Sequence, residues 1–428
     1  MKAAFITLGC KTNSYDTQAM MKILKEAGYD IINYHDKADV YIINTCAVTN
    51  ISEAKSRQAI HKAVKNSPGA VVIAAGCYSQ LSPDDVINIP GVDAVVGIKD
   101  RHRLAEIIKD AQKQKTIQVY PISDERIFEH LSVDSFEDKT RAFIKIQEGC
   151  DNYCSYCIIP YARGPARSRN LEDIIKEVKN VVSSGHKEII LTGIHIASYG
   201  KDLKNNSLID LIEKLNDIEN LKRIRLGSLE PKILDENFLA RLSKLYKVCP
   251  SFHISLQSGC DNTLKRMNRK YTSQEYYDIV CNVRKYFPNC GITTDVIVGF
   301  PAETEEDFEK SYEFCKKVGF MKIHVFPFSL KKGTAAEHIE PKVEKSVIKN
   351  RCDKMLSLSA AMQDEFNSSF IGKTFEVLFE QNNDDINEGY TDNYIFVKTR
   401  YNQVLTGQIR KVKLVTNHTE FAEAEISE

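Results

Sequence analysis

Three closely spaced cysteines constrain this chain more than any other feature of its sequence. The run reads Gly149-Cys150-Asp151-Asn152-Tyr153-Cys154-Ser155-Tyr156-Cys157 and directly follows an expected strand at Phe143–Gln147. On a loop at the carboxyl end of a strand, three thiolates can hold three irons of a 4Fe–4S cube. Such clusters normally take four cysteines, so we expect the fourth iron to be open to a substrate or cofactor.

Two other interpretations of this run are a structural zinc site and unligated thiols. Structural zinc sites close with four ligands, often as paired C-x2-C knuckles, and no second knuckle lies nearby. Unligated thiols packed this densely would be unusual. The spacing and its place after a strand therefore favour an iron–sulfur cluster.

A second set of cysteines is spread over the first eighty residues. Each lies just past an expected strand: Cys10 after Ala3–Leu8, Cys46 after Val40–Asn44 and Cys77 after Val71–Ala75. In a parallel sheet these strand ends share one edge, where open α/β folds place ligands. A lone cysteine at a strand end is usually a small buried apolar residue. Three at equivalent positions favour a second metal or cluster site, again with three ligands.

The length of 428 residues suggests about three domains. Residues 1–115 alternate strand-length apolar runs with helical patterns, which predicts a flavodoxin-like parallel sheet covered by helices. Residues 116–140 lack strong periodicity and are interpreted as a linker with one strand. A second α/β domain is expected at 136–366 and a small β-domain at 369–428.

Six strand–helix units are expected within residues 136–366. They are too few for a closed eight-unit barrel and suit a partial (βα)6, TIM-like barrel. The expected strands are Phe143–Gln147, Glu188–Thr192, Arg223–Leu226, Phe252–Leu256, Ile292–Val298 and Lys322–Phe326. The final domain is rich in aromatic and β-branched residues, which predicts a small antiparallel β-structure.

Net charge says little about partners, because Lys and Arg total 58 and Asp and Glu also total 58. The chain has 12 cysteines and no signal-type start. It also lacks an apolar stretch of the roughly 18 residues that a membrane span needs. We therefore expect a cytoplasmic protein with reduced thiols and no membrane partner.

Together and in this order, the two cysteine sets resemble the methylthiotransferase family of radical S-adenosylmethionine enzymes over nearly the whole chain. The resemblance implies an N-terminal methylthiotransferase domain, a radical core and a C-terminal TRAM domain that binds RNA. It implies two 4Fe–4S clusters, one on Cys10, Cys46 and Cys77 that handles sulfur, and a catalytic one on Cys150, Cys154 and Cys157. S-adenosylmethionine would be both the radical source and the methyl donor.

Three segments resemble the branch of this family that acts on N6-threonylcarbamoyladenosine in tRNA. They are residues 8–17, residues 157–169 and residues 253–270. This implies a transferase that adds a methylthio group to C2 of that nucleoside, next to the anticodon. Its expected partners are tRNA, a flavodoxin-type reducing protein and a sulfur source, and it is expected to be a monomer.

Three alternatives remain open at this point. The same chemistry on isopentenyladenosine is the nearest of them. An RNA-binding iron–sulfur sensor without turnover and a zinc-binding structural protein belong to different classes.

The superfamily pattern also implies contacts to S-adenosylmethionine. The candidates are Tyr156 near the adenine, Thr192 and Gly193 near the methionine part, and Ser255, Gln257, Asp295 and Val296 at the ends of later strands. Ordinary strand-end residues are the alternative for each of them. A buried Asp295 would need a partner, either a ligand hydroxyl or a neighbouring arginine.

Local basic clusters could contact RNA phosphates, although charges usually lie on a solvated surface. The candidates are Arg163, Arg167, Arg169, Lys265, Arg266, Lys398, Arg400, Arg410, Lys411 and Lys413. Aromatic residues interleave with the last five and would complete an RNA-binding face. His195 is interpreted as a solvent-facing loop residue rather than a general base.

Overall fold

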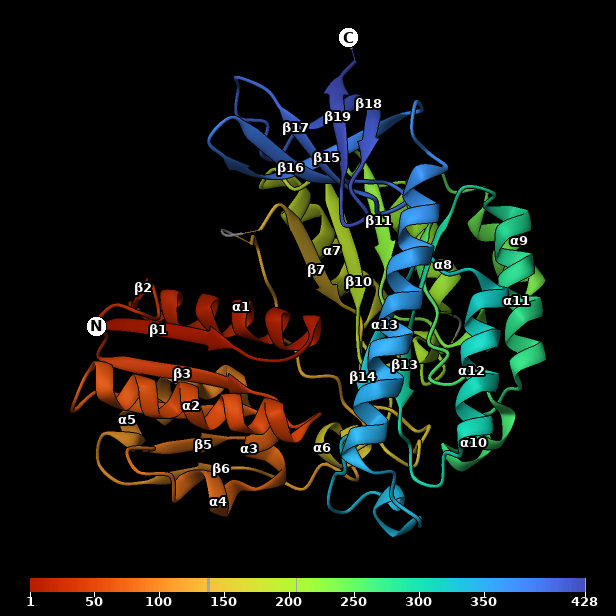
Figure 1. The fold of residues 1–428 in the computed structure, drawn as a ribbon. Helices are drawn as coiled ribbons and strands as arrows, with labels where there is room; N and C mark the ends of the chain where they lie inside the picture. Colours follow the sequence, from red (N-terminus) through yellow and green to blue (C-terminus); the bar gives the residue numbers. More distant parts are fainter. Residues whose placement is uncertain (137–138, 205, 428) are drawn as a thin grey trace.

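The chain folds into three lobes in a computed structural model that describes residues 1–136, 139–204 and 206–427 (Figure 1). An N-terminal sheet lies at the left of the figure, a larger α/β barrel at the right and a small β-barrel at the top. Residues 137–138 of the expected linker, 205 of the expected core domain and 428 of the last domain lie outside the described residues.

The N-terminal sheet is entirely parallel, in the order β2-β1-β3-β4-β5-β6. The first five positions follow the flavodoxin-like order, so the expected fold class is confirmed. The strands are β1 (Lys2–Thr7), β2 (Asp30–Ile32), β3 (Val40–Thr45), β4 (Val71–Gly76), β5 (Ala94–Val96) and β6 (Thr116–Gln118). Strand β6 comes from the expected linker and extends this sheet.

Helices cover both faces of this sheet because its central strands are apolar on both sides. One face packs on α2 (Asn50–Asn66), α3 (Cys77–Leu81) and α4 (Pro83–Ile87). The other packs on α1 (Lys11–Glu26) and α5 (Leu104–Ala111), which follows the 3-10 turn η1 (Arg101–Arg103).

The second lobe is an open barrel of six parallel strands. They are β7 (Arg141–Lys145), β10 (Glu188–Thr192), β11 (Arg223–Leu226), β12 (Ser251–His253), β13 (Gly291–Val298) and β14 (Lys322–Pro327). Parallel ladders join β7-β10-β11 and β12-β13-β14. Single bridges such as Leu229 to Ile254 connect the two halves. The expected partial (βα)6 barrel is therefore confirmed.

Helices surround the outside of this barrel. The long ones are α7 (Leu171–Ser183), α8 (Leu208–Asn216), α9 (Glu236–Leu242), α11 (Ser273–Tyr286), α12 (Glu305–Val318) and α13 (Lys345–Ser368). Short elements at the strand ends are β8 (Gln147–Glu148), α6 (Ile159–Arg163), β9 (Arg167–Ser168), η2 (Ile196–Ser198), η3 (Pro231–Ile233), α10 (Asp261–Arg266) and η4 (Ala335–His338). No helix in the described ranges is long and apolar enough to cross a membrane.

The C-terminal lobe is a closed five-stranded barrel in the order β15-β16-β17-β19-β18. Its strands are β15 (Thr374–Asn383), β16 (Ile386–Thr391), β17 (Phe396–Arg400), β18 (Ile409–Asn417) and β19 (Ala422–Ile426). The expected small antiparallel β-domain is confirmed with one exception, because β17 and β19 pair in parallel whereas the other neighbouring strands pair antiparallel. Strand direction cannot alternate around a closed ring with an odd number of strands, so at least one pair must be parallel.

Three arginines attach this small barrel to the amino-terminal ends of the large barrel's strands. Arg225 Nη2 donates to the Thr391 carbonyl at 2.7 Å, and Arg223 Nη2 donates to the Glu376 carbonyl at 2.7 Å. The Arg141 guanidinium lies 4.9 Å from the centre of the Tyr390 ring. Arg225 is also paired with Glu188 at 2.6 Å, and both side chains are buried.

We predict that Arg225→Met destabilises the protein by about 3 kcal/mol, because it leaves the Glu188 carboxylate buried without its nearest partner. This loss in the free energy of unfolding is at the low end of the range for a broken buried ion pair, because Arg223 still lies 3.6 Å from Glu188. Urea denaturation followed by circular dichroism measures the change. The control is Arg241→Met, which removes a half-exposed pair with Asp210 and is expected to cost less than about 1 kcal/mol. Equal losses in the two variants would contradict the prediction.

Candidate active site

The structure brings the first cysteine set together at the carboxyl edge of the N-terminal sheet. Cys10, Cys46 and Cys77 follow β1, β3 and β4. A Cβ atom placed on Gly9 would lie 2.9 Å from Cys46 Sγ, so the backbone before Cys10 lies against Cys46. Burial raises the pKa of Cys77 to about 11, Arg163 opposes this shift, and the nearby Cys10 and Cys46 thiols add to it.

Two glycines make this close approach possible. Gly9 and Gly76 precede Cys10 and Cys77 with φ of 101° and 98°, a backbone region that other residues rarely adopt. A Cβ atom on Gly76 would also stand 2.5 Å from Asn44 Oδ1. A side chain at either position would push the neighbouring cysteine away from the sheet edge.

The second set lies on a tightly anchored loop at the carboxyl end of β7. Gly149 opens it with φ of 72°, and a Cβ atom there would stand 1.9 Å from the Pro165 carbonyl oxygen. The Cys150 amide donates to the Gly164 carbonyl at 3.0 Å, and Ser155 Oγ donates to the Arg266 carbonyl at 2.8 Å. Burial raises the pKa of Cys157 to about 12.

The donor chemistry of both sets fits iron–sulfur clusters. All 12 cysteines are free thiols, and the members of each set interact electrostatically with one another. Within the described ranges, no three His, Cys, Asp or Glu side chains surround a single metal position. A cube asks each thiolate to bind a different iron, and each set supplies three free thiols.

Helices α3 and α6, which lie beside the two sets in the chain, contact each other. Helix α3 begins with Cys77, and α6 begins two residues after Cys157. Arg163, the last residue of α6, is 0% exposed and donates from Nε to Cys77 Sγ at 3.1 Å. Its Nη1 donates to Glu148 Oε1 at 2.7 Å.

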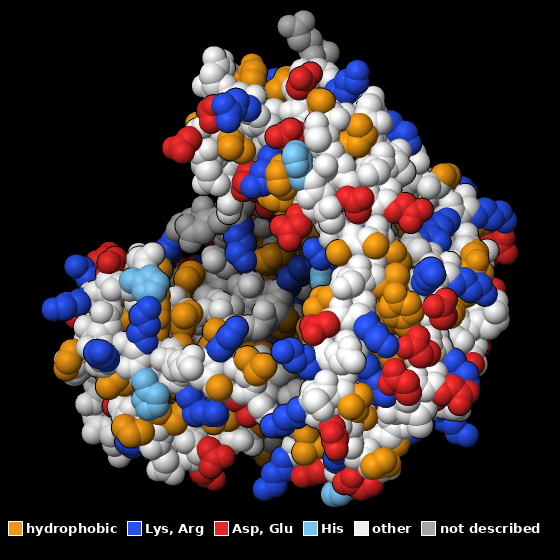
Figure 2. Space-filling model, viewed as in Figure 1, with side chains coloured by type: hydrophobic (Ala, Val, Ile, Leu, Met, Phe, Trp, Pro, Cys, Tyr) orange, Lys and Arg blue, Asp and Glu red, His pale blue; other side chains and the backbone are white. Residues whose placement is uncertain are grey.

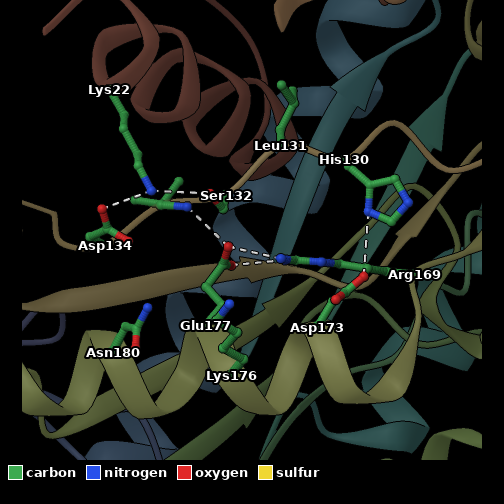
Figure 3. A pocket seen from close by; sticks show the side chains of 11 residues that line it. Lys22, His130, Leu131, Ser132, Asp134, Arg169, Asp173, Lys176, Glu177 and Asn180 are labelled. Carbon is green, nitrogen blue, oxygen red and sulfur yellow. Dashed lines mark hydrogen bonds and ion pairs between the residues drawn. The ribbon is translucent and has the colours of Figure 1, made fainter. Parts of the chain in front are cut away.

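These contacts correct the prediction that Arg163, Arg167 and Arg169 meet RNA phosphates. Arg167 is 3% exposed and donates to the Arg163 carbonyl at 2.7 Å. Arg169 lines a cavity of about 280 Å³ between α1 and α7, where its guanidinium is held by Glu177 at 2.9 Å (Figure 3). All three cations are buried against protein acceptors, so none of them is available to an outside phosphate.

Three of the candidate S-adenosylmethionine contacts, Tyr156, Thr192 and Gly193, lie on or beside the segment that carries the second cysteine set. The Tyr156 ring packs edge-on against Phe300 with 6.4 Å between ring centres. Thr192 ends β10, and its carbonyl accepts from the Ile146 amide at 2.9 Å. Gly193 follows it, and a Cβ atom there would lie 2.9 Å from the Gln147 carbonyl oxygen.

Alternation along the later strands decides which of the other candidates face the barrel interior. Ser255 and Gln257 alternate with buried Leu256, and half-buried Asp295 alternates with buried Val296. Val296 belongs to the apolar core beneath the helices, so its side chain does not face the interior.

The expected partner of Asp295 was a ligand hydroxyl or an arginine, and the structure supplies a histidine. His253 Nε2 lies 3.2 Å from Asp295 Oδ2, and the His324 ring lies 5.7 Å from the His253 ring. The barrel interior therefore contains an Asp–His pair with a second histidine beside it.

The other candidate RNA contacts remain on the surface to different degrees. Arg266 is paired with Asp307 at 2.7 Å and Lys398 with Glu388 at 2.8 Å. The other five are exposed, namely Lys265, Arg400, Arg410, Lys411 and Lys413. Arg410 also donates a hydrogen bond to Gln408 Oε1. Lys411 and Lys413 flank the buried Val412 on β18 and therefore share one outward face.

Arg269, near the second set, is not among the residues that the sequence predicts for the site, and His195 is predicted to face solvent. Arg269 donates to Cys154 Sγ at 3.5 Å and pairs with Glu230 at 2.8 Å, although only its place in a basic run could have indicated it. His195 is half-buried rather than solvent-facing, and burial lowers its pKa to about 4. Its amide donates to Gln147 Oε1 at 2.7 Å, which draws the η2 turn toward the cysteine loop.

Two family models match separate parts of the chain. The Radical SAM superfamily matches residues 144–315, and the family described as Uncharacterized protein family UPF0004 matches residues 2–97. Among solved structures, the radical S-adenosylmethionine methyltransferase TsrM from Kitasatospora setae has a TM-score of 0.59 at 14% identity. The match covers 78% of this chain and 76% of TsrM, and shows a shared fold.

Curated relatives match over most of their length. The threonylcarbamoyladenosine tRNA methylthiotransferase MtaB of Bacillus subtilis is 41% identical over 96% of this chain and 93% of its own. The MtaB of Aquifex aeolicus is 38% identical over 92% and 96%. A tRNA-2-methylthio-N(6)-dimethylallyladenosine synthase of Clostridium botulinum is 35% identical over 87% and 85%. With both cysteine sets in place and full-length relatives of this kind, the chain belongs to the radical S-adenosylmethionine methylthiotransferase family.

Proposed function

We propose that this protein converts N6-threonylcarbamoyladenosine next to the anticodon of tRNA into its 2-methylthio derivative. One observation carries the proposal: two sets of three free thiols follow the carboxyl ends of parallel strands, and the helices beside them, α3 and α6, contact each other. A single set would support radical generation or sulfur handling, whereas the family activity requires both.

Each part of the chain has a defined task in this proposal. Cys150, Cys154 and Cys157 would hold a cluster which, with S-adenosylmethionine, would supply the radical chemistry for removal of the C2 hydrogen. Cys10, Cys46 and Cys77 hold the second cluster, where the sulfur is handled. The contact between α3 and α6, with the hydrogen bond from Arg163 to Cys77, fixes the position of the first set relative to the loop of the second.

Lys11 is the residue from which we infer a preference for an anionic nucleoside. Lys11 follows Cys10 at the start of α1 and is reached by solvent, yet the protein encloses it enough that burial lowers its pKa. Its positive charge, with those of Arg141 and Arg225, acts on the Tyr394 phenol. A threonylcarbamoyl group carries a carboxylate at neutral pH, whereas an isopentenyl group is apolar. In this proposal Lys11 binds that carboxylate.

The relatives point to the same substrate. Those named for threonylcarbamoyladenosine reach 41% and 38% identity, against 35% for the dimethylallyladenosine synthase. The hollow between the three lobes is open in this view and bordered by Lys and Arg side chains (Figure 2). A tRNA anticodon loop would enter there, with residues 369–428 acting as a TRAM domain that contacts RNA through β18.

Several properties accompany this proposal. The enzyme works in the cytoplasm as a monomer, where its thiols stay reduced. It takes electrons from a flavodoxin-type reducing protein and its sulfur from a separate source. A non-catalytic iron–sulfur sensor is the competing function, and it would cleave no S-adenosylmethionine.

We predict that each cysteine set holds its own cluster. Replacing Cys150, Cys154 and Cys157 by Ala should remove about half of the iron and all 5′-deoxyadenosine formation. Replacing Cys10, Cys46 and Cys77 by Ala should also remove about half of the iron but leave 5′-deoxyadenosine formation measurable, with no methylthio product. Iron analysis and mass spectrometry of anaerobically reconstituted protein provide the readouts.

The control for the cysteine variants is Cys281→Ala with Cys352→Ala, which alters two accessible thiols outside both sets. It should retain full iron and product. Stoichiometric zinc in place of iron, or iron that is unchanged in both triple variants, would contradict the two-cluster proposal.

We predict that Lys11→Met lowers kcat/KM for tRNA carrying threonylcarbamoyladenosine by about 10- to 100-fold, because a charge-assisted contact contributes about 1.5–3 kcal/mol. Iron content is measured first, since Lys11 adjoins Cys10. Lys22→Met on the outer part of α1, where Lys22 pairs with Asp134, is the matched control and should leave kcat/KM unchanged. Unchanged kcat/KM in a fully loaded Lys11→Met enzyme would show that Lys11 does not bind the substrate carboxylate.

We predict that Lys411→Ala with Lys413→Ala weakens tRNA binding and reduces the slope of log Kd against log salt concentration by about two, one for each lost phosphate contact. Filter binding at several salt concentrations measures it. Lys310→Ala with Lys316→Ala, on the exposed side of α12, is the control and should leave the slope unchanged. A slope that does not change in the β18 variant would place the RNA on another surface.

A further inference from the structure

Arg163 is buried between the two cysteine sets and contacts the surroundings of both. It ends α6, the first helix after Cys157. A guanidinium carries five N–H donors in a fixed plane, so it can serve several acceptors at once. Three nitrogen atoms of the Arg163 guanidinium donate hydrogen bonds to three different residues.

Each direction leads to a different segment of the chain. Nε donates to Cys77 Sγ at 3.1 Å, at the start of α3. Nη1 donates to Glu148 Oε1 at 2.7 Å, two residues before Cys150. Nη2 donates to Asn13 Oδ1 at 2.5 Å, three residues after Cys10. One side chain thus joins the supports of both cysteine sets.

The carboxylates near Arg163 have other cationic partners, so its Nε–H can donate to the Cys77 sulfur. The buried carboxylates Asp16 and Glu148 are shared with Lys145 and Arg101, which contact Asp16 at 2.7 Å and 2.6 Å. Neither carboxylate therefore depends on Arg163 alone. Across the described residues, Arg163 is the only side chain found to donate a hydrogen bond to Cys77 Sγ.

We propose that Arg163 is a positioning residue that acts through the Cys77 sulfur and makes the cluster held by Cys10, Cys46 and Cys77 easier to reduce. A hydrogen bond to a ligating sulfur stabilises the more negative, reduced state of a cluster. The bonds to Glu148 and Asn13 fix the guanidinium, so the donor stays directed at the sulfur. This inference rests on the proposed function, since it takes Cys77 as a cluster ligand.

The test uses the full chain with Cys150, Cys154 and Cys157 replaced by Ala, which leaves a single cluster site. In this background, Arg163→Lys keeps the positive charge but lacks the planar fork that serves Cys77 and Glu148 together. Arg101→Lys is the matched control, because Arg101 belongs to the same buried ion network and contacts no cysteine. Anaerobic redox titration followed by electron paramagnetic resonance gives the midpoint potential of the cluster.

We expect a more negative midpoint potential in Arg163→Lys and an unchanged one in Arg101→Lys. An unchanged potential in Arg163→Lys, or equal shifts in both variants, would overturn the inference, since the effect would then be absent or merely that of the ion network. If the background protein itself binds no iron, the assignment of Cys10, Cys46 and Cys77 fails and the proposed function fails with it. If the background protein binds iron but Arg163→Lys does not shift the midpoint potential, only the role of Arg163 fails and the proposed function stands.

Loss of iron in Arg163→Lys is interpreted by a second measurement. Thermal unfolding of the metal-free chain, followed by circular dichroism, shows whether the variant still folds. A chain that unfolds at the same temperature as the background but cannot hold iron supports a role directed at Cys77. A chain that is unfolded, while Arg101→Lys is folded, would overturn the inference and make Arg163 an ordinary structural ion.

Discussion

A buried ion network on the inner side of α1 holds the two cysteine-bearing lobes together. Asp16 receives Arg101 at 2.6 Å and Lys145 at 2.7 Å, and Glu148 receives Arg163 at 2.7 Å. Burial opposes ionisation of Asp16, yet these cations hold its pKa below the usual range. Charges buried this deeply cost several kcal/mol each unless all are paired, so the network persists only when the lobes are correctly docked.

Buried arginines also hold the amino-terminal end of the large barrel to the C-terminal lobe. Arg223 and Arg225 reach from the strand starts to backbone carbonyls of the small C-terminal barrel, and Glu188 neutralises them. Cys150, Cys154 and Cys157 follow the carboxyl end of β7 in this barrel, and Cys10, Cys46 and Cys77 lie at the carboxyl edge of the N-terminal sheet. The C-terminal lobe and the cysteine loop after β7 therefore lie at opposite ends of the barrel strands, and the hollow between the three lobes opens on one side of the molecule (Figure 2).

Prediction from the sequence succeeded where local pattern dictates structure. The strands that carry Cys10, Cys46 and Cys77 are short apolar runs, and such runs form buried parallel strands in most α/β folds. It failed where a side chain's partner is distant in the chain. Arg163 and Arg169 were assigned to RNA because charge alone predicts solvent or phosphate, but their partners Asp16 and Tyr15 lie 147 and 154 residues away.

The sequence by itself determined the cysteine spacing, the order of the three lobes and the family, since these depend on residue identity and short-range periodicity. Tertiary structure alone decided which polar residues are available for function. It buried three arginines, gave Asp295 a histidine partner in place of an arginine, and closed the last lobe as a mixed barrel. The physical reason is that burial and pairing depend on which segments meet in space, and contacts between distant segments leave no local trace in the sequence.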